Sequence, residues 1–229
     1  MIVFLNGGGS GDKTISAYIE INKIINHKKP VLYIPLAMDE DKHPYDSCYE
    51  WIKEEIRIID IPSIDMVRSF DELYNTDFNK YSMIFIGGGN TYKLLNGIKD
   101  SNCFDKFKDY IFSDGIVFGG SAGAVIFGKD IDSIKVMDEN NVSLKDTIGF
   151  DLLDGISIFP HYTNYKSKYT KEENEKLQEK YTDYLISFSS KEKIIAIPEE
   201  DTIFFDGKNI KVIGELPYYM FENGIKKKI

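Results

Sequence analysis

The sequence predicts an α/β fold, a three-layer αβα sandwich around a mostly parallel sheet. Short, continuous apolar runs recur along the 229 residues, and stretches with apolar residues at helical spacing separate them. Continuous apolar runs suit strands that are buried on both faces, as in a parallel sheet covered by helices. The alternation of such strands with helices is typical of this architecture. We expect residues 1–229 to form a single α/β domain.

Six apolar runs are the expected strands, and several end at glycine or proline: Ile2–Leu5, Val31–Leu36, Met83–Ile86, Ile116–Phe118, Ile156–Phe159 and Ile194–Ile197. Helical spacing predicts helices between them, over residues 13–27, 46–57, 91–98, 102–113 and 172–188. The last of these carries an apolar stripe with Lys and Glu on the other face, and we expect the stripe to pack on the core: Leu177, Tyr181, Tyr184, Leu185 and Phe188.

The end of the chain follows a different pattern. Two apolar runs, Thr202–Phe205 and Ile210–Ile213, flank a turn at Asp206-Gly207. This spacing predicts a β-hairpin, so we expect the sheet to be mixed at one edge.

Composition and charge exclude several classes of function. The formal net charge is −9, which disfavours binding to polyanions, so we expect no nucleic-acid partner. The basic cluster Lys226–Lys228 is interpreted as a solvated tail. No apolar run approaches the length of a membrane span, and the first residues do not resemble a signal peptide, so we expect no membrane partner and a cytoplasmic location.

Cysteine and histidine usage argues against metal chemistry. The two cysteines, Cys48 and Cys103, cannot form a disulfide framework or a four-sulfur zinc site. The chain has three histidines and no H-E-x-x-H motif. We therefore expect neither a metal nor another cofactor.

Three of the expected strands run directly into glycines. Ligands of open α/β sheets bind beyond the carboxyl ends of the strands, so these loops are where chemistry is expected. The first loop, Gly7–Gly11, matches neither the dinucleotide fingerprint nor the phosphate loop. We interpret it as a flexible turn into a helix.

The second loop, Gly87–Thr91, places bare backbone N–H groups at the edge of the sheet. Such groups can hold an anion or an oxyanion. Asn90 or Thr91 could equally just cap the following helix.

The third loop is the most informative. Gly119–Gly123 matches G-x-S-x-G between a strand and a helix-compatible run, which is the context of a nucleophile elbow. In such a turn the hydroxyl of Ser121 is exposed at the start of a helix. The alternative is a glycine-rich turn in which Ser121 only caps the helix.

A serine nucleophile needs a base, usually histidine, held by a carboxylate. His161 follows the expected strand Ile156–Phe159 at a carboxyl end, whereas His27 is expected at a helix end and His43 in a solvated stretch. The orienting acid has three candidates: Asp130, Asp132 and Glu199. Glu199 is harder to single out than its position suggests, because the acidic residues Glu200 and Asp201 follow it directly.

Three motifs in this order and spacing resemble the peptidase E (aspartyl dipeptidase) and cyanophycinase family of serine peptidases: Gly87–Thr91, Gly120–Ala124 and Pro160–Asn164. The resemblance runs from the first strand to about residue 206. It implies a fold similar to that of class I glutamine amidotransferases.

The resemblance also implies roles for individual residues. Ser121 would be the nucleophile, His161 the general base and Glu199, in a segment like the family's Leu-Pro-Glu, the orienting acid. The family also has an Asp about fifteen residues after the nucleophile, but here that position is near Val136. The implied oxyanion hole is formed by backbone N–H groups of Gly88, Gly89 and Ala122.

Substrate-binding positions are expected at Asn90, Tyr162 and Lys171. Lys171 stands where the family pattern has Arg, so it offers a point charge in place of a bidentate fork, and the preference for an acidic substrate is expected to weaken. Further candidates for lining the pocket lie nearby: Tyr165, Lys166 and Lys168.

The resulting hypothesis is a serine peptidase that hydrolyses small peptides, with Asp-X dipeptides as candidates, through an acyl-enzyme. We expect a monomer or a homodimer. One rival is an α/β-hydrolase, whose triad order is serine, acid, histidine, so that the acid would precede His161: Asp130, Asp132, Asp138, Asp146, Asp151 or Asp154. The other rival is a small-ligand-binding or interaction protein without catalytic activity.

Overall fold

A computed structural model describes residues 1–229. Its larger sheet has seven strands in the order β3-β2-β4-β5-β1-β8-β9. The first five of these in space are parallel: β1 (Ile2–Asn6), β2 (Val31–Ile34), β3 (Ile64–Met66), β4 (Met83–Ile86) and β5 (Ile116–Gly120). The antiparallel strands β8 (Thr202–Phe205) and β9 (Ile210–Ile213) complete it, as the predicted hairpin at a mixed edge.

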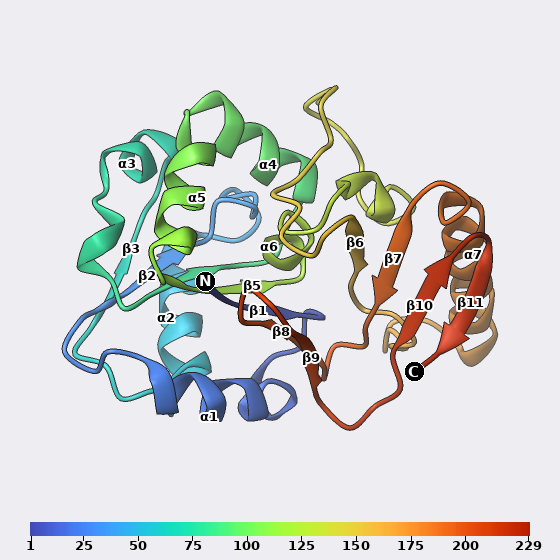
Figure 1. The fold of residues 1–229 in the computed structure, drawn as a ribbon, viewed down its shortest axis with the longest axis horizontal. Coiled ribbons are helices and arrows are strands. Elements are labelled where there is room, and N and C mark those ends of the chain that lie inside the picture. The colour runs from blue at the N-terminus through green and yellow to red at the C-terminus, as the bar shows by residue number, and fades with distance from the viewer.

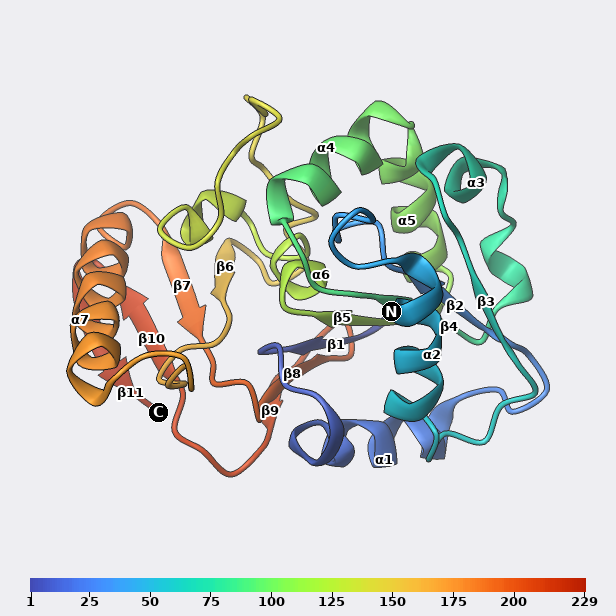
Figure 2. The ribbon, with the colours of Figure 1, turned by 180° about the vertical axis from the view of Figure 1, so that it is seen from behind.

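Helices cover both faces of this sheet, which confirms the three-layer α/β architecture. Figures 1 and 2 show α1 (Ile15–Ile24) and α2 (Tyr45–Glu55) on one face, and α4 (Thr91–Asp100) and α5 (Cys103–Phe112) on the other. The central strands β2 and β4 are buried throughout, because both faces of the sheet are covered there. Two short elements near the β3 edge were not expected from the sequence, β3 itself and α3 (Phe70–Asn75).

A second sheet of four strands, in the order β11-β10-β7-β6, lies beside the first (Figure 1). It unites β6 (Ile156–Phe159) and β7 (Lys193–Ala196), which are parallel, with the antiparallel strands β10 (Tyr219–Glu222) and β11 (Ile225–Lys228). The helix α7 (Lys171–Phe188) packs on this sheet, with Tyr181 and Leu185 buried as its apolar stripe predicts. Thus β6 and β7 are strands, as predicted, but they lie outside the central sheet.

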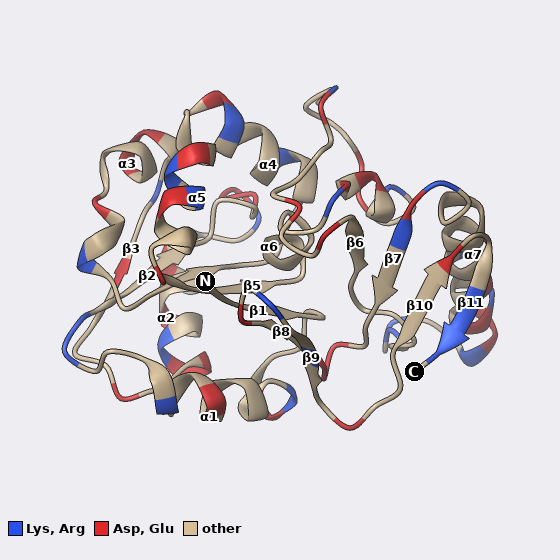
Figure 3. Ribbon diagram, in the orientation of Figure 1, with Lys and Arg blue, Asp and Glu red and all other residues tan.

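The basic cluster at the end of the chain is a strand and not a free tail. Lys226, Lys227 and Lys228 form most of β11, which Figure 3 shows in blue at the edge of the small sheet. The ammonium group of Lys226 lies 4.5 Å from the ring centre of Tyr219 and 5.1 Å from that of Tyr162. Lysines on an exposed edge strand disfavour pairing with other strands, which is a physical reason for this composition.

The connections after β1 and β5 place a site between neighbouring strands. β1 and β5 pair in parallel, and their carboxyl ends lie side by side. The chain leaves β1 toward α1, whereas it leaves β5 through the short helix α6 (Ala122–Val125), which contacts α4 on the other face. Such a divergence marks the crevice where α/β sheets bind ligands. No helix is both long enough and apolar enough to span a membrane.

Candidate active site

Ser121 occupies a strained turn between β5 and α6. Its φ of 51° and ψ of −112° lie in a region that residues other than glycine rarely adopt. The turn is tight because its glycines allow close contact: a Cβ on Gly119 would lie 2.2 Å from the carbonyl oxygen of Gly123, and one on Gly123 would lie 2.3 Å from that of Ile86. The Ser121 N–H donates to the carbonyl of Asn6 at 3.1 Å, which ties the turn to β1.

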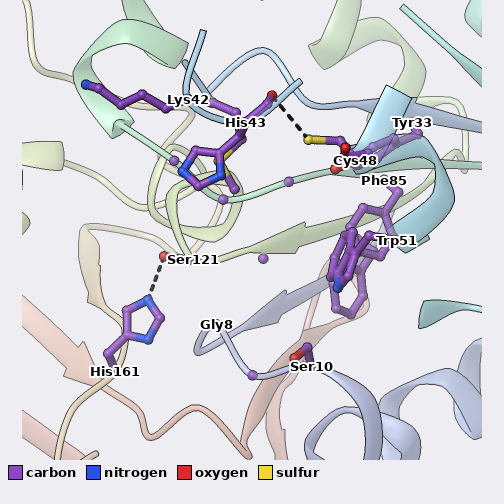
Figure 4. Close-up of a pocket in the computed structure, with 18 of the residues that line it drawn as sticks. Gly8, Ser10, Tyr33, Lys42, His43, Cys48, Trp51, Phe85, Ser121 and His161 are labelled. Atoms are coloured by element: carbon purple, nitrogen blue, oxygen red, sulfur yellow. Dashed lines mark hydrogen bonds between the residues drawn. The ribbon is translucent and has the colours of Figure 1, made fainter. Parts of the chain in front are cut away.

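The hydroxyl of Ser121 is hydrogen-bonded to a histidine from the other sheet. Its Oγ lies 2.8 Å from Nε2 of His161, as Figure 4 shows. His161 follows β6 and has a φ of 55°, which is unusual for a residue other than glycine. Its backbone N–H donates to the carbonyl of Gly7 at 2.9 Å, so the loop after β1 holds this conformation in place. The site therefore forms where the two sheets meet.

Glu199 lies on the far side of the His161 ring. Its Oε1 is 3.0 Å from Nδ1 of His161, and its Oε2 is 2.6 Å from the ammonium group of Lys13. The hydrogen bond with His161, opposed by partial burial and assisted by Lys13, lowers the pKa of the Glu199 carboxyl to about 2. The carboxylate is thus ionised near neutral pH and can only accept a hydrogen bond. In a neutral imidazole this arrangement places the proton on Nδ1 and leaves Nε2 free to accept from Ser121.

Two further residues extend this hydrogen-bonded chain. The side-chain oxygen of Asn164 accepts from the backbone N–H of Glu199 at 2.7 Å, and its amide donates to Glu200 at 2.9 Å. Lys13 bridges Glu199 to Glu200, whose Oε1 lies 3.0 Å away. Lys13 precedes the helix that covers the sheet, far from Glu199 in the sequence, and no local motif indicates this contact.

The first glycine cluster packs against the loops that carry His161 and Glu199. A Cβ on Gly7 would lie 1.9 Å from the carbonyl oxygen of Pro198, and one on Gly8 would lie 2.1 Å from Cε1 of His161. The N–H of Gly9 donates to the carbonyl of Glu199 at 3.0 Å. The interpretation of this segment as a flexible turn was therefore wrong, since Gly7, Gly8 and Gly9 are required by close packing around the site.

Asn6 anchors the same loop, and the sequence interpretation missed it. Its side chain is fully buried at the end of β1. The amide donates to Thr202 Oγ1 at 3.0 Å and to the carbonyl of Asp201 at 3.2 Å, while its oxygen accepts from the N–H of Gly8 at 2.8 Å. A polar residue that ends an apolar strand is the only signal that the sequence offers for this role.

The second glycine cluster brings free N–H groups close to Ser121. The backbone N–H groups of Gly88 and Gly89 donate to no acceptor within the chain. A Cβ on Gly88 would lie 3.3 Å from Cβ of Ser121, so this glycine is in direct contact with the strained turn. Ala122 follows Ser121 as the first residue of α6, a position whose N–H has no acceptor within the helix. Donors at these positions can stabilise a negatively charged oxygen.

A cavity of about 610 Å³ opens beside Ser121. The loops described above line one side of it, and aromatic residues line much of the rest. His43, which was expected to be solvated, has an exposed side chain at the cavity and does not contact Ser121 or Glu199. His27 lies elsewhere, with its Nδ1 2.7 Å from the carbonyl of Asp60.

The structure does not bring Asn90, Tyr162 and Lys171 into this cavity. The side chain of Asn90 caps α4 through the N–H of Lys93 and donates to the carbonyl of Glu139. Tyr162 is fully buried in the core, and Lys171 is 82% exposed at the start of α7. Their expected role in substrate binding finds no support in this geometry, because core packing and helix capping already engage the first two.

The alternative acids do not contact His161. Asp132 accepts from the hydroxyl of Tyr92 at 2.8 Å, and Asp138 accepts from the N–H and hydroxyl of Thr91 at 2.8 Å. The other carboxylates considered are also not hydrogen-bonded to His161: Asp130, Asp146, Asp151 and Asp154. The order of the contacting residues along the chain is therefore serine, histidine, acid, unlike that of an α/β-hydrolase.

Comparisons with known proteins identify the family and the fold. The sequence model of the family described as "Peptidase family S51" matches residues 2–213. An uncharacterized peptidase of Listeria monocytogenes, Lmo0363, is 31% identical over 185 residues, which cover 80% of this chain and 84% of the relative. Peptidase E of Pasteurella multocida is 24% identical over 201 residues, covering 86% of this chain and 80% of the relative.

Two solved structures share the fold. A candidate peptidase E protein from Listeria monocytogenes EGD-e superposes with a TM-score of 0.70 at 24% identity, covering 94% of this chain and 98% of its own. A peptidase from an acI-B1 Actinobacterium superposes with a TM-score of 0.65 at 17% identity, covering 100% of this chain and 93% of its own.

Proposed function

This chain belongs to peptidase family S51, and from that membership we propose that it is a serine-type peptidase acting through Ser121, His161 and Glu199. The observation that carries the proposal is the continuous hydrogen-bonded chain from the Ser121 hydroxyl through the His161 ring to Glu199. A hydroxyl, a base and an orienting carboxylate in this order form the arrangement that activates a serine nucleophile.

In the proposed acylation step, Ser121 Oγ attacks the scissile carbonyl carbon while Nε2 of His161 takes the hydroxyl proton. The ionised Glu199 stabilises the resulting imidazolium and keeps its proton on Nδ1. The carbonyl oxygen becomes an oxyanion as the C–O bond to Ser121 forms. Backbone N–H groups of Gly88, Gly89 and Ala122 are the proposed donors to it, each worth about 3 kcal/mol.

Collapse of this intermediate breaks the C–N bond, and His161 returns its proton to the leaving amine. Water then attacks the acyl-enzyme with His161 as the base, which releases the acid product and restores Ser121. The strained backbone of Ser121 supports this role, because strain of this kind persists only where the surrounding structure enforces it and it gathers at functional sites.

The cavity supports a short peptide as the substrate. Its volume of about 610 Å³ lies within the range of sites that enclose small ligands, roughly 300–1,000 Å³. Lys171, the residue expected to hold an aspartyl side chain, does not line it. We therefore propose short peptides as the substrate class and do not extend the aspartyl preference of the family name to this chain.

Amino-acid release from a panel of dipeptides tests the proposal. The panel contains acidic, neutral, aromatic and basic residues at the first position, and Ser121→Ala serves as the control. We expect release by the wild type that falls by at least about 10³-fold in the variant. Equal release by both proteins would contradict the nucleophilic role of Ser121, and binding without release would favour a ligand-binding protein.

A further inference from the structure

One wall of the cavity beside Ser121 is built from aromatic rings. Tyr33, Trp51 and Phe85 line it together, and their ring centres are 5.7 to 6.3 Å apart. Phe118 continues the wall, stacked on Phe85 at 4.6 Å, and Tyr18 packs on Phe118 at 5.3 Å. The fold assembles these rings from different elements, since the strands β2, β4 and β5 and the helices α1 and α2 each supply one.

The rings are held rigidly with respect to Ser121. Tyr18, Tyr33, Phe85 and Phe118 are each at most 2% exposed, so the packing of the core fixes them. Trp51 is 41% exposed and closes the outer side of the wall. The exposed ring of Trp51, fixed by the buried rings behind it, favours a flat apolar group, because stacked or edge-to-face contacts add to the gain from removing apolar surface from water.

The charges of the cavity do not suit an acidic side chain. The lysine that lines it, Lys42, is 77% exposed and already pairs with Asp39 at 3.0 Å. His43 lies beside it with an exposed side chain. A carboxylate placed among the rings would lose its water without gaining a buried partner, which is strongly unfavourable.

The cavity also lacks a partner for a basic side chain. No Asp or Glu is among the residues that line it. A lysine or arginine side chain would therefore carry its charge into the aromatic wall without a carboxylate to pair with. The neutral wall and the cavity volume of about 610 Å³ leave a large apolar side chain as the group that fits.

The position of the wall identifies the part of the substrate that it contacts. His161 must protonate the leaving amine, so the leaving group lies on the His161 side of Ser121. Figure 4 shows the Ser121 hydroxyl between His161 and the rings of Tyr33, Trp51 and Phe85. The acyl part of the substrate, on the side away from His161, is the part that faces this wall.

Resting on the proposed serine mechanism, we infer that the cavity binds a large apolar side chain, preferably aromatic, on the acyl side of the scissile bond. The specificity is thus set mainly by Trp51, the exposed ring of the wall that Tyr33 and Phe85 support from behind, and not by a cation. Full burial of one such side chain gives a preference of about 10- to 100-fold over glycine. The preference over aspartate is expected to be at least as large.

Phosphonate inhibitors test this inference without knowledge of the leaving group. Diphenyl phosphonate analogues of phenylalanine, glycine and aspartate are compared, each with a free and with an acetylated amino group, and the rate of modification of Ser121 is measured by mass spectrometry. A small alkyl fluorophosphonate measures the intrinsic reactivity of Ser121 in the same preparation. We expect the phenylalanine analogue to react about 10- to 100-fold faster than the other two.

Trp51→Ala identifies the wall as the cause of the preference. Its partly exposed position makes the variant compatible with folding. The ratio of the phenylalanine rate to the glycine rate should fall by about 10-fold, because part of the apolar contact is lost. Phe112→Ala is the matched control, since Phe112 is 63% exposed on α5 and does not line the cavity, and its ratio should equal that of the wild type.

The outcomes separate this inference from the proposed function. If Ser121 reacts with the fluorophosphonate but shows no preference for the phenylalanine analogue, or prefers the aspartate analogue, the inference is overturned and the serine mechanism stands. If folded wild-type protein reacts at Ser121 with none of the reagents, the proposed function fails, and the inference fails with it. An unchanged ratio in Trp51→Ala would overturn the role of the aromatic wall.

Discussion

Gly8 and His161 are in contact so close that no other residue fits at position 8. A Cβ on Gly8 would lie 2.1 Å from Cε1 and 2.6 Å from Nε2 of the His161 ring. Gly8 also has a φ of 101°, which L residues rarely adopt. The loop after β1 therefore forms the surface against which the imidazole rests, next to Cε1 and the two ring nitrogens that bond Ser121 and Glu199.

This contact predicts that Gly8→Ala impairs catalysis more than folding. The added methyl group displaces the ring of His161, and a displacement of about 1 Å can cost about 100-fold in rate. We expect kcat to fall by at least this factor, measured on the best peptide of the panel. Gly11→Ala is the matched control: Gly11 also has a positive φ, but a Cβ there meets nothing within 4 Å. It should lose about 1 kcal/mol of stability and retain activity, so an equal loss of activity in both variants would contradict the role given to Gly8.

The ion pair between Lys13 and Glu199 should stabilise the folded state near neutral pH, and this stabilisation should be lost at acidic pH. The folded-state pKa of Glu199 is lowered to about 2, so its ionised form stabilises the fold above its ordinary pKa of about 4.5, and this stabilisation is lost as the pH falls toward 2. Without Lys13 the folded-state pKa of Glu199 should lie closer to its ordinary value, so the loss of stability should be smaller and should be complete at a higher pH. Urea unfolding of Lys13→Met between pH 2 and 6 measures this, with Lys23→Met as the control because Lys23 pairs only with Glu20 on the surface. If the free energy of unfolding depended on pH identically in Lys13→Met and the wild type, Lys13 would not contribute to the lowered pKa of Glu199.

The buried carboxyl group of Asp201 should make the stability of the fold depend on pH in the opposite direction. Both of its carboxylate oxygens are buried without a hydrogen-bond partner, and burial raises its pKa to about 6. The native state therefore binds a proton more tightly than the unfolded chain, and stability falls as the pH rises from about 4 through 6. We expect Asp201→Asn to be more stable than the wild type at pH 8, by about 2 kcal/mol, and to lack this fall. Chemical unfolding at pH 4 and pH 8 decides the matter, and a less stable variant at pH 8 would contradict the prediction.

The fold class, Ser121 and His161 could be predicted from local signals in the sequence, whereas Glu199 was one of several candidate acids and was selected only by the resemblance to a known family. Strand, glycine and helix signals lie within a few residues of Ser121, and His161 and Glu199 each follow an apolar run. The second sheet could not be predicted in this way. It pairs β7 with β10, which lies far along the chain. The lysines of β11 are typical of a solvated tail and give no signal of a strand.

The parts of the site that the sequence did not reveal depend on contacts between distant segments. Asn6 and Lys13 precede their partners near Glu199 by most of the chain, and the glycines of the first loop serve contacts with His161 and Pro198. The short elements β3 and α3 contain too few residues for periodicity to identify them.

A substitution of Lys171 tests whether this residue lies outside the substrate-binding cavity. Because this side chain is 82% exposed and lies outside the cavity, Lys171→Ala should change kcat/KM for every peptide by less than about twofold. A selective loss of more than about tenfold for acidic peptides would show that the expected contact with an aspartyl side chain forms after all.

The most direct test of the central claim is the rate at which a fluorophosphonate modifies Ser121. Intact-protein mass spectrometry gives the rate, and peptide mapping gives the site. We expect one modification, at Ser121, with a rate that falls by at least about 10³-fold in His161→Ala, because Nε2 of His161 accepts the hydroxyl proton. Folded wild-type protein that stays unmodified, or that reacts at Ser121 equally fast without His161, would contradict it.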